Sequence, residues 1–206
     1  MQEKKNTIIN VGRSFGSGGG YVGQAIAEKL GIPFYDNELI SKAAEESGYS
    51  KDLFAGGEKK RSIFSASSFF TSGRMSYMDS AYVNDDILFK AQSEVIRSVA
   101  EKGDAVIIGR CADYILRDLN CLDVFVCGPE AYRIQRLVEL EGLSADEAEA
   151  LMRRKDRTRE TYYNYYTFGA WGVASNYDLC VDSSILGIEG TADFIIDFGR
   201  RAGKIR

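Results

Sequence analysis

The sequence contains no histidine, only 2 prolines, and no apolar run that approaches the ~18 residues of a membrane span. The absence of histidine excludes Ser-His-Asp and Cys-His catalytic arrangements and every histidine-ligated metal site. Four cysteines are present, but none are spaced as a C-x-x-C pair, which argues against a zinc ribbon or a thioredoxin-like redox site. Any chemistry must therefore use carboxylates, arginine, lysine, hydroxyl groups and backbone amides.

The charge balance and the length indicate a single acidic domain. The 206 residues include 26 lysines and arginines against 30 aspartates and glutamates, so the net charge is −4. One domain with a lid or an insertion fits this length, and the acidic balance does not favour nucleic acid as a partner. The first residues lack the pattern of a signal peptide. We expect a cytoplasmic protein that binds neither nucleic acid nor a membrane.

Short β-branched runs alternate along the chain with stretches of helical periodicity. The runs predict strands at residues 7–11, within 31–36, and at 105–108, 122–127 and 179–181. Helices are predicted up to about residue 30 and over 37–47, 83–101, 111–118, 129–141, 145–166 and 189–200. This alternation predicts an α/β fold: a parallel sheet with helices on both faces, which binds ligands beyond the carboxyl ends of its strands.

One segment interrupts this pattern. Residues 55–80 are rich in serine and include several aromatic residues and a short basic run. The composition is typical of a mobile cover or insertion, and a plain surface loop explains it equally well.

A glycine-rich segment between the first strand and the first helix predicts a phosphate site. Glycines let backbone N–H groups approach an anion closely, and the helix that follows adds the positive end of its dipole. The candidate phosphate-binding residues are Gly16, Ser17, Gly18, Gly19 and Gly20.

Two motifs fit this segment imperfectly. Residues 18–23 match the dinucleotide fingerprint G-x-G-x-x-G, with Asp36 near the end of the second strand. The longer spacing from the strand suits a P-loop, G-x-x-x-x-G-K-[ST]. In that alignment Arg13 replaces the first glycine, Gly19 the lysine and Gly20 the hydroxyl residue. The motifs alone do not decide between the two alternatives.

A cluster of arginines favours phosphoryl transfer. Residues 153–159 contain five basic side chains and one aspartate in an otherwise acidic protein, and four tyrosines follow within residues 162–166. Arginine forks match phosphate oxygens and neutralise the charge that develops in phosphoryl transfer, although a solvated charged helix is the plainer alternative. The candidate catalytic residues are Arg13, Arg153, Asp156, Arg157 and Arg159.

Two further candidates follow predicted strands. Arg110 ends the run Val-Ile-Ile-Gly, at a place where an anion is expected. Asp36 precedes a predicted helix and has two equally matched interpretations. It is either the N-cap of that helix or a ligand of Mg²⁺ or of an acceptor nucleotide.

These residues resemble the cytidylate kinase-like family of P-loop nucleoside monophosphate kinases. The matching stretches are RSFGSGG at 13–19, LGIPFYD at 30–36, IGRCADYIL at 108–116, and residues 156–184, which end in NYDLCVDSS. They cover nearly the whole chain in order, apart from residues 55–80, and they are more specific together than the glycine segment alone.

The resemblance implies a fold and an activity. The fold would be a single three-layer P-loop kinase domain over residues 1–206, with a five-stranded parallel sheet, an acceptor-binding region at 37–82 and an arginine-rich lid at 144–172. ATP would lie over residues 16–20 and, with Mg²⁺, transfer its γ-phosphoryl group to a nucleoside monophosphate similar to CMP or dCMP.

The resemblance also suggests roles for individual residues. Gly109 and Arg110 would hold the acceptor phosphate, and Tyr35 and Asp36 the acceptor nucleotide. Three lid residues would close over the phosphoryl group in transfer, namely Arg153, Asp156 and Arg159.

The chain departs from classical cytidylate kinases at the P-loop lysine, where it has Gly19. Loss of that charge weakens stabilisation of the transition state unless another cation replaces it. We hypothesise that Arg13 or the lid arginines supply this charge. The alternative function is a nucleotide-binding sensor or partner protein without turnover, and a homodimer is compatible with the sequence.

Overall fold

The computed structural model describes residues 6–46 and 78–206. The predicted insertion at residues 55–80 lies outside the described residues except for its last three positions, and so does most of the acceptor-binding region at 37–82.

The five strands form one parallel sheet in the order β2-β3-β1-β4-β5. Their bounds are β1 Ile8–Arg13, β2 Phe34–Tyr35, β3 Ala105–Ile108, β4 Leu122–Cys127 and β5 Leu179–Asp182. A dinucleotide-binding sheet has the order 3-2-1-4-5-6, with the second strand beside the first. Because β3 lies beside β1 here, the strand order excludes the dinucleotide interpretation of the glycine segment.

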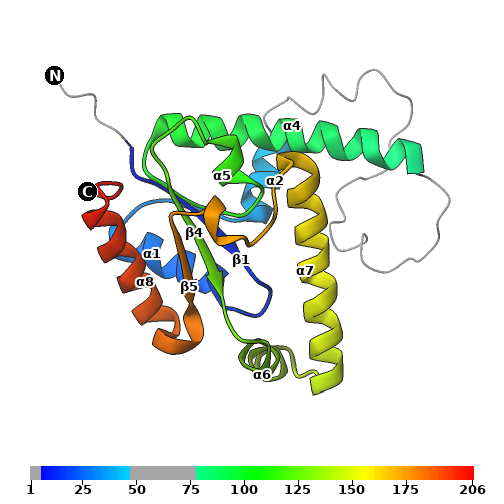
Figure 1. Cartoon of the computed structure of the whole chain (residues 1–206). Helices are drawn as coiled ribbons and strands as arrows, with labels where there is room; N and C mark the ends of the chain where they lie inside the picture. Colours follow the sequence, from blue (N-terminus) through cyan, green and yellow to red (C-terminus); the bar gives the residue numbers. More distant parts are fainter. Residues whose placement is uncertain (1–5, 47–77) are drawn as a thin grey trace.

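Helices cover both faces of this sheet, as the alternating pattern predicted (Figure 1). On one face α1 (Gly19–Leu30) and α8 (Ser183–Arg201) pack on the sheet with Ile26 and Ile195 fully buried. On the other face lie α2 (Asn37–Glu46), α4 (Met78–Lys102) and α5 (Ala112–Ile115), with Ile40 and Ile96 in the core. Burial of such side chains stabilises the sheet by about 1.5–3 kcal/mol each.

Two helices extend away from the sheet toward the carboxyl ends of the strands. They are α6 (Glu130–Glu141) and the long α7 (Ala145–Thr167), which stands along one side of the molecule in Figure 1. Ser144 and Glu147 form a capping box that starts α7. Met152 is buried between α7 and α6 and fixes the pair together. The predicted lid is therefore a continuous helix over most of its length, followed by a short 3₁₀ turn, η2 (Ala174–Asn176).

Three helices differ from the sequence prediction by more than one residue. Helix α4 starts at Met78 rather than at residue 83, and α8 starts six residues early because Asp182 caps it. Gly187, with φ of 65°, kinks α8 near its start. Helix α5 is shorter than predicted, since it begins after Cys111, which has a φ of 56°, and ends before Leu116, which has a φ of −102°. No helix in the described parts of the chain has the length and apolarity needed to cross a bilayer.

Candidate active site

The glycine segment forms a loop between β1 and α1 that is held open by two left-handed glycines. Gly16 and Gly18 have φ of 82° and 80°, a conformation that other residues adopt only with strain. Gly18 is also the N-cap of α1, so the first N–H groups of this helix lie at the loop. Gly20 has open space where a side chain would lie, so the fold does not require glycine there. The loop has the geometry of an anion site.

Ser17 braces this loop from within. Its side chain is fully buried, and its hydroxyl contacts the carbonyl oxygens of Ser14 at 2.9 Å and Val126 at 3.1 Å. The hydroxyl of Ser183, at the start of α8, donates to the carbonyl of Ser17 at 2.5 Å. The Ser17 hydroxyl therefore ties the loop to β4, and ligand contacts at this position are left to the backbone.

Arg13, the last residue of β1, crosses the carboxyl ends of β1 and β3. Its Cβ and Cγ lie against Gly19 at the start of α1. Its guanidinium group lies against Gly109, which follows β3. The Arg13 side chain thus passes from the glycine loop to the segment that carries Arg110.

Two more arginines converge on this place from other elements. Arg110 has a φ of 54°, its Nε donates to the side-chain oxygen of Asn37, and it lies 5.4 Å from the centre of the Tyr162 ring. Arg159 on α7 donates to the carbonyl of Arg13 at 3.1 Å and stacks 5.2 Å from the Phe15 ring. We call Arg13, Arg110 and Arg159 the arginine cluster.

The arginine cluster carries positive charge that no described ion pair neutralises. Among the side chains that the structure describes, no carboxylate forms an ion pair with any of its three members. Burial, followed by the charges of Arg159 and Arg110, lowers the pKa of Arg13 to about 9, and the carboxylate of Asp36 opposes this effect. Burial also lowers the pKa of Arg159. Desolvated like charges of this kind are relieved by binding an anion.

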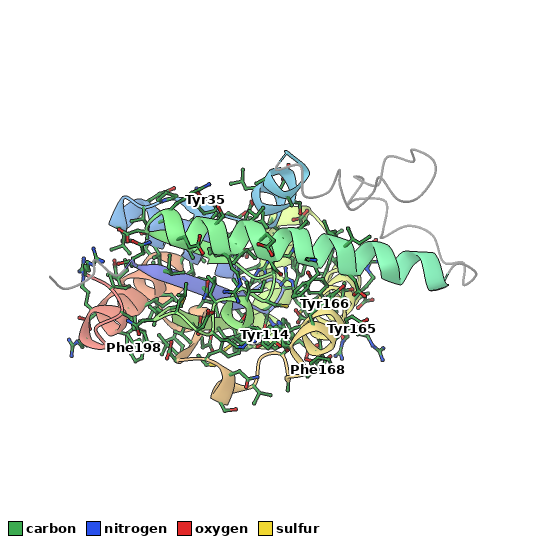
Figure 2. The ribbon with its side chains drawn as sticks, turned by 90° about the horizontal axis from the view of Figure 1, so that it is seen from above. Tyr35, Tyr114, Tyr165, Tyr166, Phe168 and Phe198 are labelled. Atoms are coloured by element: carbon green, nitrogen blue, oxygen red, sulfur yellow. The ribbon has the colours of Figure 1, made fainter. Side chains whose placement is uncertain are left out.

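Asp36 acts as a helix cap. Its Oδ1 accepts hydrogen bonds from the backbone N–H groups of Glu38 and Leu39 at 3.0 and 2.9 Å, which satisfies the first turn of α2. Tyr35 ends β2 and packs against the core beneath α4 (Figure 2). The capping role of Asp36 is therefore established, while contacts of Tyr35 and Asp36 with an acceptor stay predictions.

Asp156 is engaged with the glycine loop. One carboxylate oxygen accepts the N–H of Phe15 at 2.7 Å, and the other pairs with Nη1 of Arg133 at 2.5 Å. Arg133 on α6 also donates to the carbonyl of Phe15 at 3.1 Å, and its backbone lies against Gly16. Both Asp156 oxygens are used in this way, so Asp156 links α7 and α6 to the loop. A contact of Asp156 with the transferring phosphoryl group stays a prediction.

The other two candidate catalytic residues, Arg153 and Arg157, lie away from the arginine cluster. Arg153 is exposed and pairs with Glu130 at 2.7 Å and with Glu149 at 2.8 Å. Arg157 is exposed on α7. The structure thus places Arg13, Arg110 and Arg159 together but leaves Arg153 and Arg157 on the outer part of the helix.

Sequence reasoning missed three residues that shape the site, namely Asn37, Arg133 and Tyr162. Tyr162 had a signal, because it belongs to the tyrosines that follow the basic run. Tyr166 from the same run, labelled in Figure 2, stacks on Phe89 of α4. Nothing in the sequence distinguishes Arg133 from other arginines on an amphipathic helix.

Among the described residues no group of three or more cysteines, aspartates or glutamates is arranged to hold a metal ion. Mg²⁺ in phosphoryl-transfer sites takes one or two carboxylates and otherwise binds phosphates and water. Asp36 lies close enough to the cluster to affect the pKa of Arg13. A role of Asp36 as a ligand of Mg²⁺ stays a prediction.

Solved structures with similar folds support this architecture. A crystal structure of an uncharacterized protein from Eubacterium ventriosum is 29% identical, with a TM-score of 0.69 over 93% of this chain and 96% of that one. TT1252 from Thermus thermophilus is 16% identical, with a TM-score of 0.55 over 95% and 98% of the two chains. Shikimate kinase from Bacteroides thetaiotaomicron is 15% identical, with a TM-score of 0.52 over 94% and 98%.

Comparison at the sequence level gives the family. No curated protein matches the sequence significantly. The profile of the cytidylate kinase-like family, however, matches residues 8–185, which span β1 to the start of α8 and include the glycine loop, the arginine cluster and Asp156. The protein has the P-loop kinase fold and belongs to the cytidylate kinase-like family.

Proposed function

We propose that the protein transfers the γ-phosphoryl group of ATP to a nucleoside monophosphate, with CMP or dCMP as the first acceptors to test. The observation that carries this proposal is the arginine cluster, which gathers three arginines beside the glycine loop at the carboxyl ends of β1 and β3, none of them ion-paired with a described carboxylate. Phosphoryl transfer depends on positioning and charge, and it needs no histidine. The family name is the support for cytidylate as the acceptor.

The proposed role of each residue follows from its position in the site. The backbone of residues 16–20 binds the phosphates of ATP at the N-terminus of α1. Arg13 lies between this loop and Gly109, where it stabilises the charge on the group in transfer. Arg110, oriented by Asn37 and Tyr162, binds the phosphate of the acceptor. Asp36 is the candidate protein ligand for Mg²⁺, which would supply further neutralisation of the phosphate charge.

The test is release of ADP from ATP and Mg²⁺ in the presence of CMP, dCMP, UMP or AMP in turn. We expect release that depends on the acceptor and is fastest with CMP or dCMP. Arg110→Ala should abolish this dependence and leave the affinity for ATP within about threefold, because Arg110 lies on the acceptor side. ATP binding without release, for every acceptor, would instead favour the alternative of a sensor or partner protein.

The pKa of Arg13 predicts a dependence on pH. We expect kcat/KM to fall as the pH rises through about 9, the value to which burial and the neighbouring arginines lower the pKa of Arg13. Bound phosphates favour the charged form, so kcat should stay constant to a higher pH. Profiles of kcat/KM and kcat from pH 7 to 10.5 measure both effects. The same fall in Arg13→Ala would show that another group causes it.

A further inference from the structure

Two glycines lie in contact with Arg13, at opposite ends of its side chain. We propose that Gly19 and Gly109 are positioning residues for Arg13, and that the arginine at 13 excludes a lysine at 19. The loop then receives its cation from the end of β1 rather than from the first turn of α1. This inference rests on the proposed function only for the role of the charge, since the steric relation is independent of it.

At Gly19 the limitation is space. This residue is buried in the first turn of α1, and its φ is not in the left-handed region, so backbone conformation does not require glycine. A Cβ there would lie 2.5 Å from Cβ of Arg13, 3.2 Å from its Cγ and 3.1 Å from Cβ of Val126. Real Cβ atoms essentially never come as close as 2.5 Å, and the two contacts of 3.1 and 3.2 Å are tighter than most real Cβ contacts. Because Cβ of Arg13 is fixed to the backbone, rotation of the arginine does not remove this overlap.

At Gly109 two constraints coincide. Its φ of 69° disfavours any side chain, and a Cβ there would collide with Nη1 of Arg13. The colliding atom is the end of a flexible side chain, so alanine at 109 would displace the guanidinium group and leave the stem in place. The two glycines thus leave room for the two ends of the Arg13 side chain: Gly19 for its stem and Gly109 for its guanidinium group.

The absence of the P-loop lysine follows from this arrangement. A side chain at 19 would have to occupy the volume that holds the stem of Arg13. With glycine at 13 this volume becomes free, except for the contact with Val126. Arginine at 13 with glycine at 19 is therefore one way to place a positive charge at the loop, and glycine at 13 with lysine at 19 is the alternative.

The first test is a double-mutant cycle of Arg13→Gly and Gly19→Ala, because only glycine at 13 removes the Cβ that a side chain at 19 would meet. Each single substitution should weaken ATP affinity and kcat by about tenfold or more, whereas Gly19→Ala should change them less than about threefold when residue 13 is already glycine. Gly109→Ala should likewise lower kcat when Arg13 is present and have a smaller effect on kcat when Arg13 has been replaced. The control is Gly103→Ala, at a glycine with open space and no left-handed φ. It should leave ATP affinity and kcat unchanged both in the wild type and in the variant at residue 13.

The second test exchanges the two positions. Gly19→Lys alone should be inactive, and Arg13→Gly combined with Gly19→Lys should recover at least about a tenth of the wild-type ATP affinity and turnover. An active Gly19→Lys single variant, or an equal effect of Gly19→Ala in both backgrounds, would overturn the inference.

Three readouts separate this inference from the proposed function. Absence of ADP release by the wild type contradicts the proposed function, and the cycle is then read from ATP affinity by calorimetry. If ATP does not bind either, the cycle is read from the unfolding temperature. Destabilisation by Gly19→Ala only when Arg13 is present supports the inference, and equal destabilisation or failure to fold in both backgrounds refutes it.

Discussion

Arg13→Ala is expected to lower kcat for phosphoryl transfer about 10³-fold, the scale measured for arginines and oxyanion donors that stabilise developing charge. The structure gives the physical reason. Arg13 is the member of the arginine cluster that joins the glycine loop to the Arg110 segment, and the described residues offer it no ion pair to compete with a phosphate. Steady-state kinetics with varied ATP and a saturating acceptor separate kcat from KM.

Two further variants define what the Arg13 result means. Arg13→Lys keeps a positive charge and should therefore retain part of the kcat that Arg13→Ala loses. The recovery should be incomplete, because the lysine ammonium group lacks the planar fork of arginine. Arg97→Ala removes an exposed arginine of α4 that pairs with Asp118 at 3.3 Å, and it should leave the kinetics unchanged. Wild-type kinetics in Arg13→Ala would show that the charge replacing the P-loop lysine comes from elsewhere.

The fold could be predicted from local sequence patterns because each strand is a short apolar run bounded by polar residues. Residues 105–108 and 122–127 were predicted as strands and are strands with the same bounds. The strand order could not be predicted, since it depends on which buried faces fit together across the sheet. That order, with β3 beside β1, is what distinguishes the two motifs that the glycine segment matched equally.

The site was predictable as a set of residue types but not as an arrangement. The sequence indicated that Arg13 and Arg110 follow strands, and parallel strands bring such residues to one edge. Along α7 the basic run gave no sign of which side chains turn inward: Arg159 reaches the loop, while Arg153 pairs with surface glutamates. That difference depends on where α6 packs, which the spacing of charges does not encode.

Gly19 is the clearest example of a structural constraint that could not be predicted from the sequence. Its position suggested a lost lysine, which is a statement about charge. The contact with Arg13 is a matter of volume, and it arises because the end of β1 and the start of α1 are brought together by the loop. The glycine at the place of the lysine is thus, in our inference, a condition for the position of Arg13.

Asp156→Ala is expected to destabilise the protein by about 3 kcal/mol and to raise KM for ATP about tenfold or more. The Asp156 and Arg133 side chains are only 19% and 15% exposed, so removing one partner leaves a largely buried charge without compensation. The N–H of Phe15 loses its acceptor at the same time. Because both groups hold the glycine loop, the loss should affect ATP binding rather than acceptor binding.

Matched variants separate this positioning role from direct catalysis by Asp156. Asp156→Asn keeps an acceptor for the N–H of Phe15 but loses the ion pair with Arg133, so stability and ATP affinity should both be intermediate. Asp146→Ala, at an exposed position in the first turn of α7, should change stability by less than about 1 kcal/mol. Urea unfolding and ATP titration measure these effects. A loss of kcat in Asp156→Asn with unchanged stability and ATP affinity would instead place the carboxylate at the transferring phosphoryl group, as the lid motif predicted.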